Sequence, residues 1–146
     1  MRTKTSNTLL ALTFFIISSE AAHATEKSPW IGEWLSYDPT SMKTDPGSII
    51  SVTDFDGELI FSSTGLSYPS SPGHNTIYTL NSSACQEQTF SKDKSKVLFK
   101  YSGCKNSSFD GNKLICQMRS ASEEANPMII CSAHGIDKYF RKTIKK

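Results

Sequence analysis

The sequence contains no long hydrophobic segment. Its longest mostly apolar stretch covers the nine residues 9–17, whereas a helix needs about 20 apolar residues to cross a bilayer. No later segment is apolar enough to span one either. We therefore expect no membrane-spanning helix and no membrane anchor.

Residues that support catalysis are also scarce. Hydrolysis by a serine nucleophile needs a base beside the serine, most often a histidine. Beyond residue 24 the chain has only His74 and His134, and no Gly-x-Ser-x-Gly motif is present. We expect that the protein is not an enzyme, so catalysis ranks behind the two binding functions considered below.

Closely spaced metal ligands are absent. The four cysteines are 19, 12 and 15 positions apart, so the chain has no Cys-x-x-Cys pair of the kind that holds zinc. Residues 54–58 (DFDGE) supply only a fragment of an EF-hand calcium loop. We expect no bound metal and no cofactor.

The sequence has little excess charge of either sign. Its formal net charge is +2 at pH 7, whereas a nucleic-acid-binding domain usually carries a strong basic excess. Nucleic acid is therefore not the expected partner.

The N-terminal segment has the three parts of a cleavable export signal. Arg2 and Lys4 precede the apolar stretch, and Ala22-His23-Ala24 supplies the small-x-small pattern that signal peptidase reads. We expect cleavage after Ala24, so that residues 25–146 form one small domain. This domain is expected in the periplasm or outside the cell.

The cysteines lie in the second half of the chain, at Cys85, Cys104, Cys116 and Cys131. An even number in an exported protein indicates two disulfides. We favour 85–104 with 116–131, because these pairings centre two hairpins on the polar residues 94–95 and 123–124. The alternative starts from a turn at Asp110-Gly111, which pairs 104 with 116 and leaves 85 for 131.

Short β-branched or aromatic runs alternate with turns along the rest of the chain, which is typical of antiparallel β proteins. Asp56-Gly57 between two such runs is a strong hairpin signal. We predict an all-β fold, a small antiparallel barrel or sandwich of about seven to eight strands. Strands are expected at residues 48–52, 57–61, 76–80, 96–101, 113–119, 128–133 and 138–144.

Gly32 and Trp34 form a Gly-x-Trp motif at the start of the expected mature chain, within the segment 29–34 (PWIGEW). A Gly-x-Trp that enters the first strand resembles the opening of lipocalin-like proteins. The resemblance covers these few residues and implies an eight-stranded up-and-down barrel. It also implies that a basic residue packs over the tryptophan, and Arg141 is the candidate for that position.

The sequence combines an expected export signal and one small domain with two expected disulfides, and it lacks a recognisable group of catalytic residues. This combination is similar to the profile of periplasmic inhibitor and immunity proteins. The profile favours a protein that blocks a partner in the cell envelope, such as a cell-wall hydrolase or a delivered toxin. Residues 38–48 and 69–75 are predicted loops and the expected binding surface, because rigid scaffolds often carry recognition on loops. The candidate residues in the second loop are Pro69, Ser70, Ser71, His74 and Asn75.

The alternative function is a carrier of a small apolar ligand. A small barrel is either filled by its inward side chains or leaves a cavity for a ligand. A carrier predicts a cavity lined by Val97, Phe99, Tyr101, Leu114 and Met118. The sequence leaves the oligomeric state open.

Overall fold

The computed structural model describes residues 27–81, 84–105, 108–119 and 127–143. The expected export signal, residues 1–24, lies outside these segments, and so does the hairpin centre at residues 123–124. Within them, no helix is long and apolar enough to cross a membrane.

Ten strands make up most of the described chain and confirm the predicted all-β class. Eight of them form one antiparallel sheet in the order β3-β2-β1-β10-β9-β8-β7-β6, and β4 pairs with β5 in a separate two-stranded sheet. The strands are β1 (Gly32–Asp38), β2 (Lys43–Phe55), β3 (Glu58–Ser63), β4 (Leu66–Ser71), β5 (His74–Tyr78), β6 (Gln86–Phe90), β7 (Lys96–Tyr101), β8 (Lys113–Arg119), β9 (Met128–Ala133) and β10 (Ile136–Lys142).

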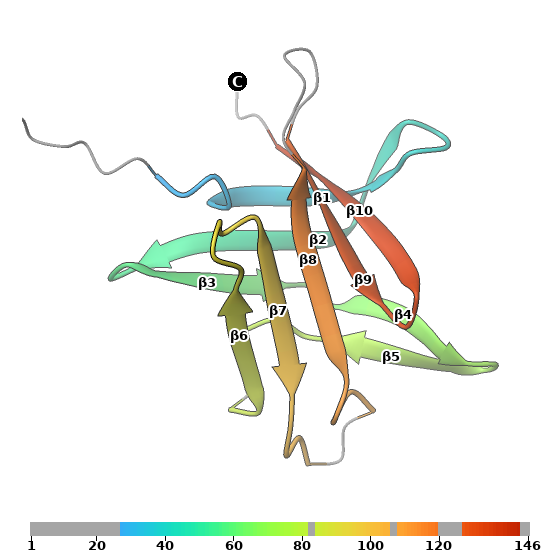
Figure 1. The fold of residues 1–146 in the computed structure, drawn as a ribbon. Coiled ribbons are helices and arrows are strands. Elements are labelled where there is room, and N and C mark those ends of the chain that lie inside the picture. The colour runs from blue at the N-terminus through green and yellow to red at the C-terminus, as the bar shows by residue number, and fades with distance from the viewer. Residues whose placement is uncertain (1–26, 82–83, 106–107, 120–126, 144–146) are drawn as a thin grey trace, which may run out of the picture.

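The large sheet curls into an open half-barrel (Figure 1). Strands β1 to β3 lie across the view and β6 to β8 lie roughly upright in it, while β9 and β10 join the two halves. The β4–β5 hairpin crosses the lower part of the molecule. Because β3 pairs only with β2 and β6 only with β7, the sheet has two open edges.

Aromatic side chains fill the concave side of the sheet. Phe61 of β3 lies 5.2 Å from Phe99 of β7 between ring centroids, although these strands are not neighbours in the sheet. Trp30, just before β1, packs edge-on against Phe61 at 5.6 Å. Burial of such large rings stabilises the packing of the two halves against each other. The largest fully buried side chains include Trp30, Trp34, Tyr68, Tyr78, Tyr101, Phe61, Phe99 and Phe140.

Two tight turns have backbone conformations that the sequence encodes directly. Asp56 and Gly57 connect β2 to β3 with φ angles of 53° and 83°, and His134 and Gly135 connect β9 to β10 with 51° and 73°. Positive φ at both central residues is the type I′ geometry that suits a two-residue hairpin. The prediction of a hairpin at Asp56-Gly57 is therefore confirmed.

The favoured disulfide pairing is confirmed as well. Cys116 and Cys131 face each other directly across β8 and β9, with Cα atoms 4.0 Å apart. Cys85 and Cys104 join the two ends of the β6–β7 hairpin, with Cα atoms 5.3 Å apart. Disulfides of this kind persist in oxidising compartments, so the protein functions outside the reducing cytoplasm.

Both predicted loops are in large part strand. β2 begins at Lys43 and contains all of residues 43–48, and β4 and β5 leave only Pro72-Gly73 as the turn within 69–75. Proline, glycine and serine suggested loops there, but both segments are the projecting ends of hairpins, where a strand needs few apolar residues. The strands β4 and β6 were not predicted at all.

Candidate binding surface

The five candidate residues of the second predicted loop lie at the free end of the β4–β5 hairpin. Pro69, Ser70, Ser71, His74 and Asn75 are all exposed. The opposite face of the same hairpin is buried, because Leu66, Tyr68, Thr76 and Tyr78 pack into the core. The hairpin thus presents exposed polar groups on a base that is fixed to the sheet.

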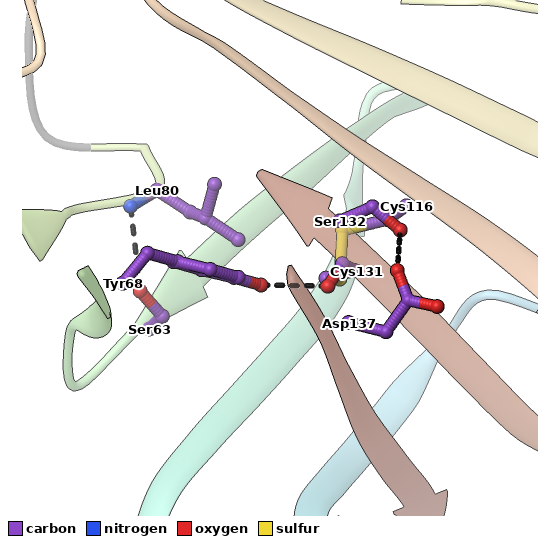
Figure 2. Close-up of a disulfide and its surroundings, with 7 residues drawn as sticks. All are labelled: Ser63, Tyr68, Leu80, Cys116, Cys131, Ser132 and Asp137. Atoms are coloured by element: carbon purple, nitrogen blue, oxygen red, sulfur yellow. Dashed lines mark hydrogen bonds between the residues drawn. A yellow bond between two sulfur atoms is a disulfide. The ribbon is translucent and has the colours of Figure 1, made fainter. Parts of the chain in front are cut away.

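A buried tyrosine anchors this base beside a disulfide. The Tyr68 hydroxyl donates a 2.7 Å hydrogen bond to the carbonyl oxygen of Cys131 (Figure 2). Lys138 of β10 lies over the Tyr68 ring, with its Nζ 5.3 Å from the ring centre. Burial raises the pKa of Tyr68, so its hydroxyl remains a hydrogen-bond donor at neutral pH.

The first predicted loop forms the end of the β1–β2 hairpin. The Asp38 carboxylate closes this turn, accepting hydrogen bonds from the Ser41 hydroxyl at 2.7 Å and the Thr40 amide at 2.9 Å. These bonds, the one from Ser41 first, lower the pKa of Asp38. Met42 follows, and 68% of its side chain is exposed.

A shallow hollow of about 380 Å³ lies between this hairpin end and β10. Its lining residues are Ser36, Tyr37, Asp38, Pro39, Thr40, Asp137, Lys138 and Tyr139. Lys138 therefore contacts β4 through Tyr68 and also borders the hollow at the β1–β2 end. We call residues 38–42, 69–75, Lys138 and Tyr139 together the hairpin surface.

The sequence alone did not place Lys138 and Tyr139 at this surface. Their neighbours Pro39 and Thr40 are almost a hundred positions away in the chain, and only the pairing of β1 with β10 brings them together. No local sequence pattern predicts this pairing, because the two strands are the first and last of the described chain. β10 was predicted as a strand at residues 138–144, whereas a strand at β1 was expected only from the Gly-x-Trp resemblance.

The tryptophan of the Gly-x-Trp motif is fully buried and has a cation above it, but the cation is not Arg141. Lys142 Nζ lies 5.2 Å from the Trp34 ring centre and donates a 2.9 Å hydrogen bond to the Pro29 carbonyl oxygen. Arg141 lies instead over Tyr37, at 3.9 Å. The expectation for Arg141 is wrong because neighbouring strand residues point to opposite faces, and Lys142 has the position that faces Trp34.

The residues expected to line a ligand cavity are packed together. Val97, Phe99, Tyr101 and Leu114 are at most 1% exposed and belong to one core cluster, against which the partly buried Met118 packs. The β4–β5 hairpin contributes Tyr68 and Tyr78 to the same cluster. These side chains are therefore packed together in the core cluster of the described residues.

The two histidines lie in different surroundings. His74 is exposed at the hairpin tip, whereas His134 Nε2 is 3.1 Å from the Tyr78 hydroxyl. Among the residues that the structure describes, no group of three or more His, Cys, Asp or Glu side chains is arranged to hold a metal ion.

No protein-family model, no curated protein and no solved structure matches this chain.

Proposed function

We propose that the protein is an exported binding protein, periplasmic or secreted, that blocks a partner protein through its hairpin surface. A cell-wall hydrolase and a delivered toxin are the partner classes that suit such a role. The observation that carries the proposal is that the exposed end of the β1–β2 hairpin and the base of the β4–β5 hairpin both lie against the same strand, β10.

The anchoring of the β4–β5 hairpin supports the proposal. Tyr68 is held by the Cys131 carbonyl, and Cys131 is bonded to Cys116. A surface that is already ordered loses less conformational entropy when a partner binds. Tight blocking of a partner benefits from this property, since ordering costs reduce affinity directly.

The filled core favours protein binding over the carriage of a small apolar ligand. Phe99, Tyr101 and Leu114 make the interior contacts that a carrier would reserve for its ligand. The hollow at the hairpin surface is open and lies between exposed segments, which suits contact with a protein.

The test begins with the exported protein, purified with both disulfides intact and crosslinked in an envelope extract. A partner identified by mass spectrometry is then purified and titrated, together with a panel of cell-wall hydrolases, while its activity is measured. We expect a stoichiometric complex and loss of the partner's activity. Thr40→Arg and Ser70→Arg each place a bulky charge on the hairpin surface and should weaken this complex at least about tenfold.

Matched controls are Thr53→Arg on β2 and Ser62→Arg on β3, both exposed positions outside the hairpin surface. They should bind as the wild type does. Equal binding by all four variants would exclude the hairpin surface as the contact. A lipid recovered from the purified protein by organic extraction, with no protein partner, would support the carrier function instead.

A further inference from the structure

The two open edges of the large sheet border a groove that the hairpin surface does not include. The groove has a volume of about 660 Å³. It lies between residues 58–61 of β3 and residues 86–89 of β6, and Asn81 and Ala84 also line it. It shares no residue with the hollow beside β10.

The edge of β6 presents main-chain hydrogen-bonding groups toward this groove. On its other side, Cys85 accepts a bond from the Ser102 amide and Ser91 donates one to Lys96, both at 3.0 Å. In an antiparallel ladder the bonded residues alternate with residues whose N–H and C=O groups point away. The groups of Gln86, Gln88 and Phe90 therefore point away from β7, toward the open edge.

One glutamine side chain crosses the groove, and the acceptor of a second is left without a partner. The Gln88 Nε2 donates a 3.0 Å hydrogen bond to the carbonyl oxygen of Leu59, which links β6 to β3. Gln86 Oε1 is buried and accepts no hydrogen bond from any residue that the structure describes. A buried acceptor without a donor costs free energy, which a ligand with N–H groups would recover.

The charge of the groove is negative. Among the described residues that line it, the ionisable ones are Glu58 and Glu87, and Asp54 and Asp56 lie near Glu58 at the β2–β3 turn. Glu87 is opposite Lys100 in the register of β6 and β7. Neither glutamate, however, forms an ion pair within the described part of the chain.

We propose that this groove binds an extended, lysine- or arginine-rich segment of a partner protein. The segment adds to the edge of β6 as a further strand, and its cationic side chains pair with Glu58 and Glu87. Strand addition obtains its affinity from main-chain hydrogen bonds and its specificity from alternate side chains. A second copy of this chain is a poor occupant, because its own groove edge would bring carboxylates against carboxylates.

The probe is a blocked hexapeptide of alternating lysine and valine, titrated into the purified disulfide-bonded protein. We expect saturable binding measured by calorimetry, with amide chemical-shift changes and slower hydrogen exchange at Gln86, Gln88 and Phe90. A glutamate–valine hexapeptide should not bind. A lysine–valine peptide N-methylated at every residue keeps its side-chain charge but has no main-chain N–H donor on either edge, and it should bind at least about tenfold more weakly.

Glu58→Gln and Glu87→Gln should each weaken binding about two- to fivefold, the range for an exposed ion pair. Glu33→Gln on β1 removes the same charge at an exposed position outside the groove and should leave affinity unchanged. Equal binding of the methylated and unmethylated peptides to the wild-type protein would overturn strand addition. Equal effects of the three substitutions would overturn the assignment to this groove. Neither result depends on the hairpin surface, so the Thr40→Arg and Ser70→Arg variants should bind the peptide normally.

Discussion

Three buried tyrosines differ in what their hydroxyl groups contact. Tyr68 donates to the Cys131 carbonyl and Tyr78 meets His134, whereas the Tyr101 hydroxyl has no hydrogen-bond partner within the described segments. Burial raises the pKa of all three, so each hydroxyl stays protonated at neutral pH and, as a buried donor, needs an acceptor. The rings also contact one another, with Tyr78 lying 5.6 Å from Tyr68 and 5.2 Å from Tyr101. Because the three rings are buried to a similar extent, we expect their hydroxyl groups to contribute differently to the free energy of unfolding according to whether each is hydrogen-bonded.

Removing the hydroxyl groups one at a time tests this difference. Tyr68→Phe removes the buried hydrogen bond to the Cys131 carbonyl, which is still paired with β10, and should lower the free energy of unfolding by about 0.5–1.5 kcal/mol. Tyr101→Phe removes an unpaired buried group at nearly constant volume, so it should leave stability unchanged or raise it by up to about 1 kcal/mol. Urea unfolding of both variants against the wild type measures the two values. A loss in Tyr101→Phe as large as that in Tyr68→Phe would mean that Tyr101 is hydrogen-bonded, for example to an ordered water.

At the level of strands, the sequence predicted the elements whose apolar side chains face the core. β7, β8 and β9 were placed at their observed bounds, because their inward positions are apolar. β6 was missed because two of its inward residues, Gln86 and Gln88, are polar. Those glutamines face the groove at the sheet edge. The polar side chains that kept β6 from being predicted therefore also supply polar groups to the groove.

β4 was missed for a different reason. Pro69 and the Pro72-Gly73 turn make residues 69–75 similar to a loop in composition. Only the β4–β5 pairing, which opposes Leu66 to Tyr78 and Tyr68 to Thr76, shows a strand with one buried face. The candidate residues in this segment were placed correctly on the surface, but their attachment to a fixed base required the contact between Tyr68 and β9.

The type I′ turn between β2 and β3 provides a test at this scale. A Cβ at Gly57 would meet no atom within 4 Å, so substitution there changes only the backbone cost. Gly57→Ala forces a non-glycine residue to φ 83° and should lower the free energy of unfolding by about 1–2 kcal/mol. Gly57→Asn should cost less, because asparagine adopts this region more readily. Thermal unfolding of the two variants compares them, and equal losses would argue against the turn geometry.

At the level of the whole molecule, the two disulfides close chain loops of similar length but lie in different surroundings. Cys116 and Cys131 are at most 1% exposed at the centre of the core, whereas Cys85–Cys104 ties the ends of the β6–β7 hairpin at the sheet edge. The sequence separations are 15 and 19 residues. In the loop-entropy description each bridge then contributes about 2–4 kcal/mol, with a difference of only a few tenths between them.

The packing around the two bridges should therefore decide their relative effect. The double variant Cys116→Ala/Cys131→Ala removes a crosslink and also opens a space among core side chains, which adds a cavity term. Cys85→Ala/Cys104→Ala removes a crosslink of similar entropy where Cys85 is only partly buried. We expect the first variant to lose at least about 1 kcal/mol more unfolding free energy than the second, measured by urea unfolding at equal concentration. The second variant should instead show faster amide exchange along β6, because that edge strand pairs with β7 alone. If the edge variant were the less stable one, closure of the half-barrel at β6 would contribute more to the fold than its buried core does.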